Sequence, residues 1–177
     1  MLTREGAEAA LQELVAELEQ RGHKSKIYIV GGAALMLGFG ARDATRDIDA
    51  VITPRAEILQ IVAEVARRKN LTDDWLNSAA AAMYVPAWPD DPNPRIIIST
   101  ERVQISIASA EMLLAMKIHA SRGRQDIEDL RFLLAEVGID NYEDAVSHFE
   151  HFYEDNPIKN RATKILIEIF GGPGSPT

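Results

Sequence analysis

The sequence predicts an α/β (α+β) fold in which a small mixed sheet with flanking helices precedes a helical C-terminal half. Two short, β-branched runs at 26–30 and 47–52 end in Gly-Gly and Thr-Pro, as strands bounded by turns do. A second pair of strands is expected at 95–99 and 102–107. From residue 109 onward the apolar residues recur at helical spacing, so strands and helices alternate at the start of the chain and helices follow at its end.

The helices are assigned from the same periodicity. The first runs from about Thr3, a good capping residue, to Gln20, and Gly22 ends it. A short helix at 33–38 is followed by a polar loop at 40–46, and the segment 86–94, with four prolines, is loop. The remaining helices are expected at 55–69, 73–83, 109–121, 124–136, 141–153 and 158–170.

A chain of 177 residues fits one domain and is long enough to bury a substantial core. Residues 1–108 are predicted to form its core, 109–170 a helical part of the same domain, and 171–177 a flexible tail rich in glycine and proline. The absence of cysteine excludes disulfides and thiolate metal sites.

The net charge of −8 argues against a protein that coats long nucleic acid through its phosphates. No apolar run approaches the ~20 residues that a membrane span needs, and the first residues do not resemble a signal peptide. We therefore expect a cytoplasmic protein with no membrane partner.

The glycine pair after the first strand is the first candidate for a binding site. Gly31 and Gly32 allow backbone N–H groups to approach an anion such as phosphate without interference from a Cβ atom. The alternative is that the two glycines only permit a tight turn or close helix packing.

Asp47 and Asp49 are more informative. Residues two apart in a strand point to the same face, so both carboxylates project to one side. Like charges so close require a cation or strong donors, and carboxylate oxygens suit Mg²⁺, or Mn²⁺, holding a nucleoside triphosphate. Thr45 and Arg46 precede them and are expected to contact the phosphates, whereas Arg42 is expected to be a solvated loop charge. The alternative for the two aspartates is a solvated strand start.

These two motifs resemble the signature of the DNA polymerase beta-type nucleotidyltransferase superfamily. The resemblance rests on the Val-Gly-Gly-Ala-Ala-Leu run at 30–35 and the Thr-Arg-Asp-Ile-Asp run at 45–49. The glycine pair and the Thr-x-Asp-Ile-Asp ending resemble the AbiEii/MenT-like branch. That branch includes toxins of bacterial toxin–antitoxin pairs, some of which add nucleotides to the acceptor end of tRNA. The resemblance therefore implies a nucleotidyltransferase fold, transfer from a nucleoside triphosphate, a tRNA acceptor end and a cognate antitoxin protein.

A second motif lies in the helical half. Lys117 sits among apolar residues of its helix, where an ammonium group is costly to bury without a partner, so it either reaches solvent or binds phosphate. Asp126 and Asp129 share the face of the next helix near its start, and either one alternatively caps that helix or pairs with Arg122 or Arg124. This arrangement again resembles the AbiEii/MenT-like proteins, which implies that Lys117 and Asp126, or Asp129 as a supporting residue, belong to the catalytic site.

The pattern departs from the superfamily at one point. The wider superfamily places a third metal-binding carboxylate on a later strand, where this sequence offers Gln104 and Ser106. Three hypotheses remain: a magnesium-dependent nucleotidyltransferase, a module of the same fold that binds a nucleotide or a partner without turnover, or a purely structural α/β domain whose aspartates are solvated.

Overall fold

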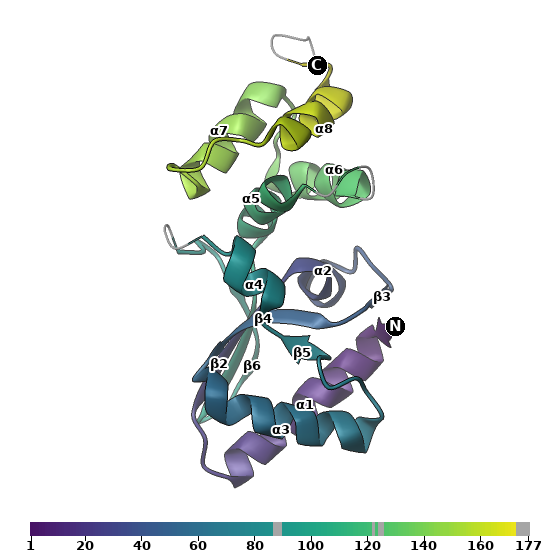
Figure 1. Cartoon of the computed structure of the whole chain (residues 1–177), viewed down its shortest axis with the longest axis vertical. Coiled ribbons are helices and arrows are strands. Elements are labelled where there is room, and N and C mark those ends of the chain that lie inside the picture. Colours follow the sequence, from purple (N-terminus) through teal and green to yellow (C-terminus); the bar gives the residue numbers. More distant parts are fainter. Residues whose placement is uncertain (87–89, 122, 124–125, 173–177) are drawn as a thin grey trace. The chain divides into compact units, whose positions relative to one another are not determined.

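The computed structural model describes residues 1–86, 90–121, 123 and 126–172, and the chain divides into two compact units (Figure 1). Unit 1 comprises Met1–Met83 and Pro94–Ala108, and unit 2 comprises Tyr84–Asn93 and Ser109–Thr177. Each unit is described by itself. Of the tail predicted at 171–177, residues 173–177 lie outside the described part.

Unit 1 is built on a five-stranded mixed sheet with the order β5-β4-β2-β7-β6. Strand β2 pairs antiparallel with β4 and parallel with β7; β4 is parallel to β5, and β6 is antiparallel to β7. The mixed α/β fold predicted from the sequence is confirmed. The strands are β2 (Ser25–Val30), β4 (Ile48–Thr53), β5 (Leu76–Asn77), β6 (Arg95–Ser99) and β7 (Val103–Ile107).

The two faces of this sheet differ in burial because side chains alternate along each strand. On one face the paired side chains are apolar and buried: Ile27, Ile29, Ile48, Ala50, Ile52, Val103, Ile105 and Ile107. On the opposite face Tyr28, Asp49, Val51, Gln104 and Ser106 are half-exposed or exposed, whereas Val30 at the end of β2 is buried. We call this second surface the open face. Asp49 is therefore held by a strand whose alternate residues are fixed in the core.

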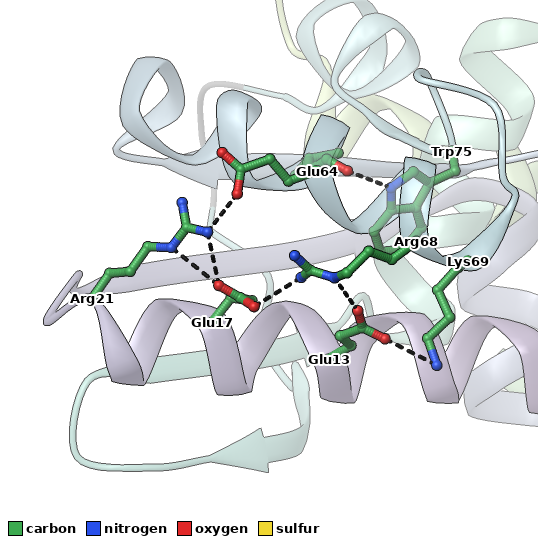
Figure 2. Close-up of polar contacts among 8 residues, drawn as sticks. Glu13, Glu17, Arg21, Glu64, Arg68, Lys69 and Trp75 are labelled. Atoms are coloured by element: carbon green, nitrogen blue, oxygen red, sulfur yellow. Dashed lines mark hydrogen bonds and ion pairs between the residues drawn. The ribbon is translucent and has the colours of Figure 1, made fainter.

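Helices α1 (Arg4–Gln20) and α3 (Arg55–Lys69) lie side by side and pack against the sheet of unit 1 (Figure 1). Thr3 caps α1 as predicted, its hydroxyl accepting a hydrogen bond from the Gly6 N–H at 3.2 Å. Figure 2 shows the ion pairs that join the two helices. Arg68 reaches Glu13 at 2.6 Å and Glu17 at 2.9 Å, and Arg21 contacts both Glu17 and Glu64. Lys69 also pairs with Glu13, and the Trp75 indole donates to the Val62 carbonyl at 3.1 Å.

Three local elements of unit 1 differ from the sequence-based expectation. The helix expected at 33–38 begins earlier, as α2 (Gly31–Ala34) continued by a π-helix, η1 (Leu35–Phe39). Part of the expected loop at 40–46 is a strand, β3 (Ala44–Thr45), which pairs antiparallel with β1 (Leu2–Thr3). The helix expected at 73–83 is wrong in its first half, because β5 runs there beside β4 and α4 (Ala79–Tyr84) begins only afterwards. Strands of two residues carry no detectable periodicity and form only through pairing with distant segments.

Unit 2 contains α5 (Ala110–Ala120), α6 (Ile127–Val137), α7 (Tyr142–Phe152) and α8 (Asn160–Phe170). These helices are where the sequence predicts them, within a few residues at each end. Ser109 caps α5 by accepting from the Met112 N–H at 3.1 Å, and Asn141 caps α7 by accepting from the Asp144 N–H at 2.8 Å. Within the described part of the chain, no helix is both long and apolar enough to cross a membrane.

Candidate functional site

The first group of predicted site residues lies where β2 ends and β4 begins. The antiparallel register pairs Val30 with Asp49, so the glycine turn that follows Val30 comes next to the Asp49 side chain. Gly31 has a φ of +64°, a left-handed conformation that glycine adopts without strain. A Cβ atom added to Gly31 would lie 3.7 Å from Asp49 Oδ2, in van der Waals contact with the carboxylate. The missing side chain therefore leaves space directly beside this oxygen.

Gly32 is enclosed by the segment that precedes the two aspartates. An added Cβ atom would lie 3.2 Å from Thr45 Oγ1 and 3.4 Å from Arg42 Nη1, closer than side chains normally approach. Thr45 is buried next to Gly32, and its hydroxyl donates to the Asp47 carbonyl at 3.1 Å. Arg46 is exposed. The expectation for Arg42 is wrong, since its half-buried guanidinium lies against the glycine turn rather than free in solvent.

Asp47 and Asp49 are both half-exposed, and each carboxylate has a hydrogen-bond donor. Asp47 Oδ2 accepts from the Asn77 side-chain amide at 3.1 Å, and Asp49 Oδ1 accepts from the Ala80 N–H at 3.3 Å. These contacts are inconsistent with two simply solvated aspartates. Asn77 was not among the predicted residues because its segment was expected to be helical; the Asn-Ser pair that interrupts the helical pattern at 77–78 was the available signal.

The donor set of this group fits a hard divalent cation. Its negative ligands are carboxylate oxygens, which Mg²⁺ and Mn²⁺ prefer, and the space beside Asp49 Oδ2 is kept clear by Gly31. Among the described residues, no group of three or more His, Cys, Asp or Glu side chains is arranged to hold a metal ion. Gln104 and Ser106 lie on the open face of β7, which β2 separates from β4.

The second group of predicted residues lies in unit 2, where α5 packs on α6. Lys117 Nζ lies 3.1 Å from Asp126 Oδ1 and 2.8 Å from Asp129 Oδ2. All three side chains are at least nine-tenths buried, at 10%, 2% and 10% exposure. The alternative that Lys117 reaches solvent is therefore wrong: a buried ammonium group is balanced here by two carboxylates.

The charge of this triad follows directly from its composition. With one ammonium group and two carboxylates it carries a net charge of −1 in its ionised form. Asp126 precedes α6 without a side-chain capping bond, so its described partner is Lys117 rather than the helix start. The alternative pairing with Arg122 or Arg124 falls on residues outside the described part of the chain.

The chain that contains these two groups of residues matches a known protein family. A family model described as "Nucleotidyltransferase of unknown function (DUF6036)" matches residues 9–164. The chain belongs to this nucleotidyltransferase family. Neither the comparison with curated proteins nor that with solved structures found a match.

The nucleotidyltransferase match covers every residue of both groups, from Gly31 to Asp129. The coarser part of the resemblance, nucleotidyl transfer, is therefore confirmed at the level of the family. The narrower AbiEii/MenT-like branch, the metal and the role of each residue stay predictions. In unit 1, the predicted site residues Gly31, Gly32, Thr45, Asp47 and Asp49 are brought together. Lys117, Asp126 and Asp129 form their own cluster in unit 2.

Proposed function

We propose that the protein is a divalent-cation-dependent nucleotidyltransferase that moves a nucleoside monophosphate from a nucleoside triphosphate to an acceptor hydroxyl. The observation that carries this proposal is that the glycine turn lies next to Asp49, with the space of the missing Gly31 side chain directly beside the carboxylate. It puts backbone that can approach phosphate beside carboxylates that can hold a cation, and phosphoryl and nucleotidyl transfer need both. Membership of the nucleotidyltransferase family supports the same reaction class.

In the proposed reaction the acceptor oxygen attacks the α-phosphorus of the triphosphate. A new P–O bond forms to the acceptor, the bond to the β-phosphate oxygen breaks, and pyrophosphate leaves with its electron pair. The acceptor proton passes to a base, for which Asp126 is our candidate. Asp47 and Asp49 would hold Mg²⁺ or Mn²⁺, which when bound offsets the negative charge of the phosphate oxygens.

We propose that the glycine turn, Thr45 and Arg46 bind the triphosphate. A different observation supports each of these roles. Gly31 and Gly32 offer backbone without side chains, whereas the buried Thr45 lies next to Gly32. Arg46 is exposed and so accessible to phosphate. We assign Arg42 to this group as well, because its guanidinium lies next to Gly32.

Lys117 is proposed to act on the triphosphate charge, and Asp129 to support it. In the described structure both aspartates already balance the ammonium group. The ammonium group has three N–H donors and two described carboxylate partners, so Lys117 can reach a phosphate either with its third donor or by exchanging one carboxylate for it. A phosphate oxygen and a carboxylate are comparable acceptors for an ammonium group, so this exchange is chemically reasonable.

For the acceptor we propose the 3′ end of tRNA, and for the biological role a toxin held in check by a cognate antitoxin. Both rest on the resemblance of the two motifs to AbiEii/MenT-like proteins. The net charge of −8 favours an acceptor that enters with one end over a long RNA bound along the surface.

The deciding experiment is transfer of label. The protein is incubated with each α-³²P-labelled nucleoside triphosphate, Mg²⁺ or Mn²⁺ and total tRNA, and the RNA is resolved on a gel. We expect label on tRNA that is lost in Asp49→Ala and kept in Asp43→Ala, an exposed aspartate of the preceding segment. Transfer that persists in Asp49→Ala would contradict the proposed site.

The second hypothesis, binding without turnover, is favoured by the lack of a three-carboxylate cluster among the described residues. It predicts that the protein binds a triphosphate, and that Asp49→Ala weakens this binding, while no label reaches any acceptor and no pyrophosphate is released. Measuring binding and pyrophosphate release in the same samples separates the two functions.

A further inference from the structure

The segment between β5 and α4 contacts both aspartates of the candidate site. Asn77, at the end of β5, donates to Asp47 Oδ2 at 3.1 Å. Three residues later the Ala80 N–H donates to Asp49 Oδ1 at 3.3 Å. The parallel pairing of Asp49 with Asn77 keeps this segment in register with β4. One short turn therefore holds two carboxylates that belong to a neighbouring strand.

The Asn77 amide is oriented by its other contacts. Its oxygen accepts from the Ala79 N–H at 2.9 Å, and its nitrogen also donates to the Asp74 carbonyl at 3.1 Å. Rotating the amide by half a turn would place its oxygen against a carboxylate and a carbonyl, and its nitrogen against an N–H group. All three contacts would then become repulsive, so the amide can present only its N–H group to Asp47.

Because the Asn77 amide is held in one orientation, it can orient the Asp47 carboxylate to which it donates. Within its own segment, the Thr45 hydroxyl donates to the Asp47 carbonyl and not to its carboxylate, whose described donor is the Asn77 amide. Partners that hydrogen-bond a metal-binding carboxylate orient it, and their removal typically weakens metal binding about 10–100-fold. Both polar atoms of the Asn77 amide are occupied, so it is suited to this supporting role and not to coordination.

We propose that Asn77 is a positioning residue that fixes the Asp47 carboxylate for the divalent cation. The inference rests on the proposed function only in that Asp47 holds a cation; it does not require that transfer take place. It assigns a role in the site to the turn before α4, which none of the predicted residues covers.

The neighbouring residue provides a matched control. Ser78 is buried, and its hydroxyl has no hydrogen-bond partner among the residues that the structure describes. Ser78→Ala removes a polar atom from the same turn without touching either aspartate. Asn77→Ser is a second informative variant, because a serine hydroxyl can still accept from a backbone N–H two residues on but is too short to replace the amide donor.

The test measures Mn²⁺ alone, by electron paramagnetic resonance titration of the full chain, without nucleotide or acceptor. We expect about tenfold weaker Mn²⁺ binding in both Asn77→Ala and Asn77→Ser, and unchanged binding in Ser78→Ala. Circular dichroism and thermal unfolding of each variant show whether the fold is kept. Asn77→Ser retains the turn contact, so loss of binding in that variant is not a folding effect.

Two results would overturn the inference. Wild-type Mn²⁺ affinity in a folded Asn77→Ser variant would show that Asp47 needs no such partner. Equal losses in Ser78→Ala and Asn77→Ser would show that the turn matters only as structure. Other results would contradict the proposed function and leave the role of Asn77 intact. These are label transfer that persists in Asp49→Ala, or a wild-type protein that binds Mn²⁺ and transfers no label. A wild-type protein that binds no Mn²⁺ overturns both.

Discussion

At the scale of single residues, two glycines of unit 1 have similar positive φ angles but differ in surroundings. Gly31 has a φ of +64° and lies next to Asp49, whereas Gly22 has a φ of +73°, and apart from its chain neighbours no described residue comes within 4 Å of an added Cβ. An L-residue in this region costs roughly 1–2 kcal/mol. Substitutions at these two glycines therefore distinguish the effect of backbone strain from the effect of blocking the site.

We predict that Gly31→Ala and Gly22→Ala each lower the free energy of unfolding by about 1–2 kcal/mol. Only Gly31→Ala should abolish label transfer, because its methyl group occupies the space beside the Asp49 carboxylate. Urea denaturation and the transfer assay measure the two effects. Equal activity of the two variants would argue against phosphate binding at this turn.

Lys117 is a residue whose structural and functional roles must be separated before its activity is interpreted. Lys117→Met leaves Asp126 and Asp129 buried without their ammonium partner. We expect this to destabilise the protein by about 3–5 kcal/mol. The triple variant Lys117→Met, Asp126→Asn, Asp129→Asn removes all three charges and should recover most of that stability, as measured by denaturant unfolding.

The same triple variant also tests the functional assignment. If Lys117 and Asp126 act in transfer, the stable triple variant stays inactive. A triple variant that folds and transfers label like wild type would reduce the triad to a structural role.

At the scale of elements, α7 contains a histidine whose neutral form is favoured by burial. His148 lies against α5, where its Nε2 is 2.8 Å from the Glu111 carbonyl. Burial lowers the pKa of His148 below its ordinary value of 6.5, although the contact with Glu111 partly opposes this shift. Near pH 6 the unfolded chain therefore binds more protons than the folded chain, and stability falls as the pH drops through about 6.5 toward the lower folded pKa.

We predict that the thermal midpoint decreases between pH 7.5 and pH 5.5, and that His148→Gln makes this decrease smaller. Glutamine keeps a donor for the Glu111 carbonyl but does not titrate. His119, whose pKa burial also lowers, accounts for part of the remaining dependence. Glu13 and Glu64, whose pKa values their Arg and Lys partners hold below 4.5, act only at lower pH and do not interfere. An unchanged pH dependence in His148→Gln would contradict this assignment.

The elements also show where sequence reasoning works and where it does not. The alternation in β4 correctly places the Asp49 carboxylate on the open face, and capping by Thr3 correctly starts α1. Both signals are local. The turn at Asn77 was missed because an alanine-rich segment favours helix, while the pairing of β5 with β4 depends on residues nearly thirty positions away. Arg42 was misjudged for the same reason, since its contact with Gly32 crosses from one segment to another.

At the scale of the whole molecule, the fold class was predictable because strands alternate with helices up to residue 107, and the described elements after that are helices. The site was predictable only in part. The motifs identify Asp47, Asp49 and the glycine pair, but the partners that orient a carboxylate come from tertiary contacts that no spacing reveals. The pairing of Lys117 with two aspartates is of this kind: the sequence indicates an unusual lysine and does not show that its charge is already balanced.

The net charge of −8 leads to a prediction about RNA binding by the whole chain. A protein that contacts only the end of an RNA releases few counterions, so the slope of log affinity against log salt should be shallow, of magnitude about 1–3. Filter binding of tRNA between low and physiological salt measures this slope. A slope of roughly −6 or steeper would indicate contact with many phosphates and would contradict an acceptor bound by its end.

The pairing of β1 with β3 affects how this protein should be labelled for such measurements. Leu2 lies opposite Thr45, and the Thr45 hydroxyl is bonded to Asp47. A fluorophore or affinity tag attached at Met1 would therefore lie one residue from the β1–β3 pairing, next to the segment that contains Asp47. Reporters are better placed on the exposed outer side of α3, for example at Arg55.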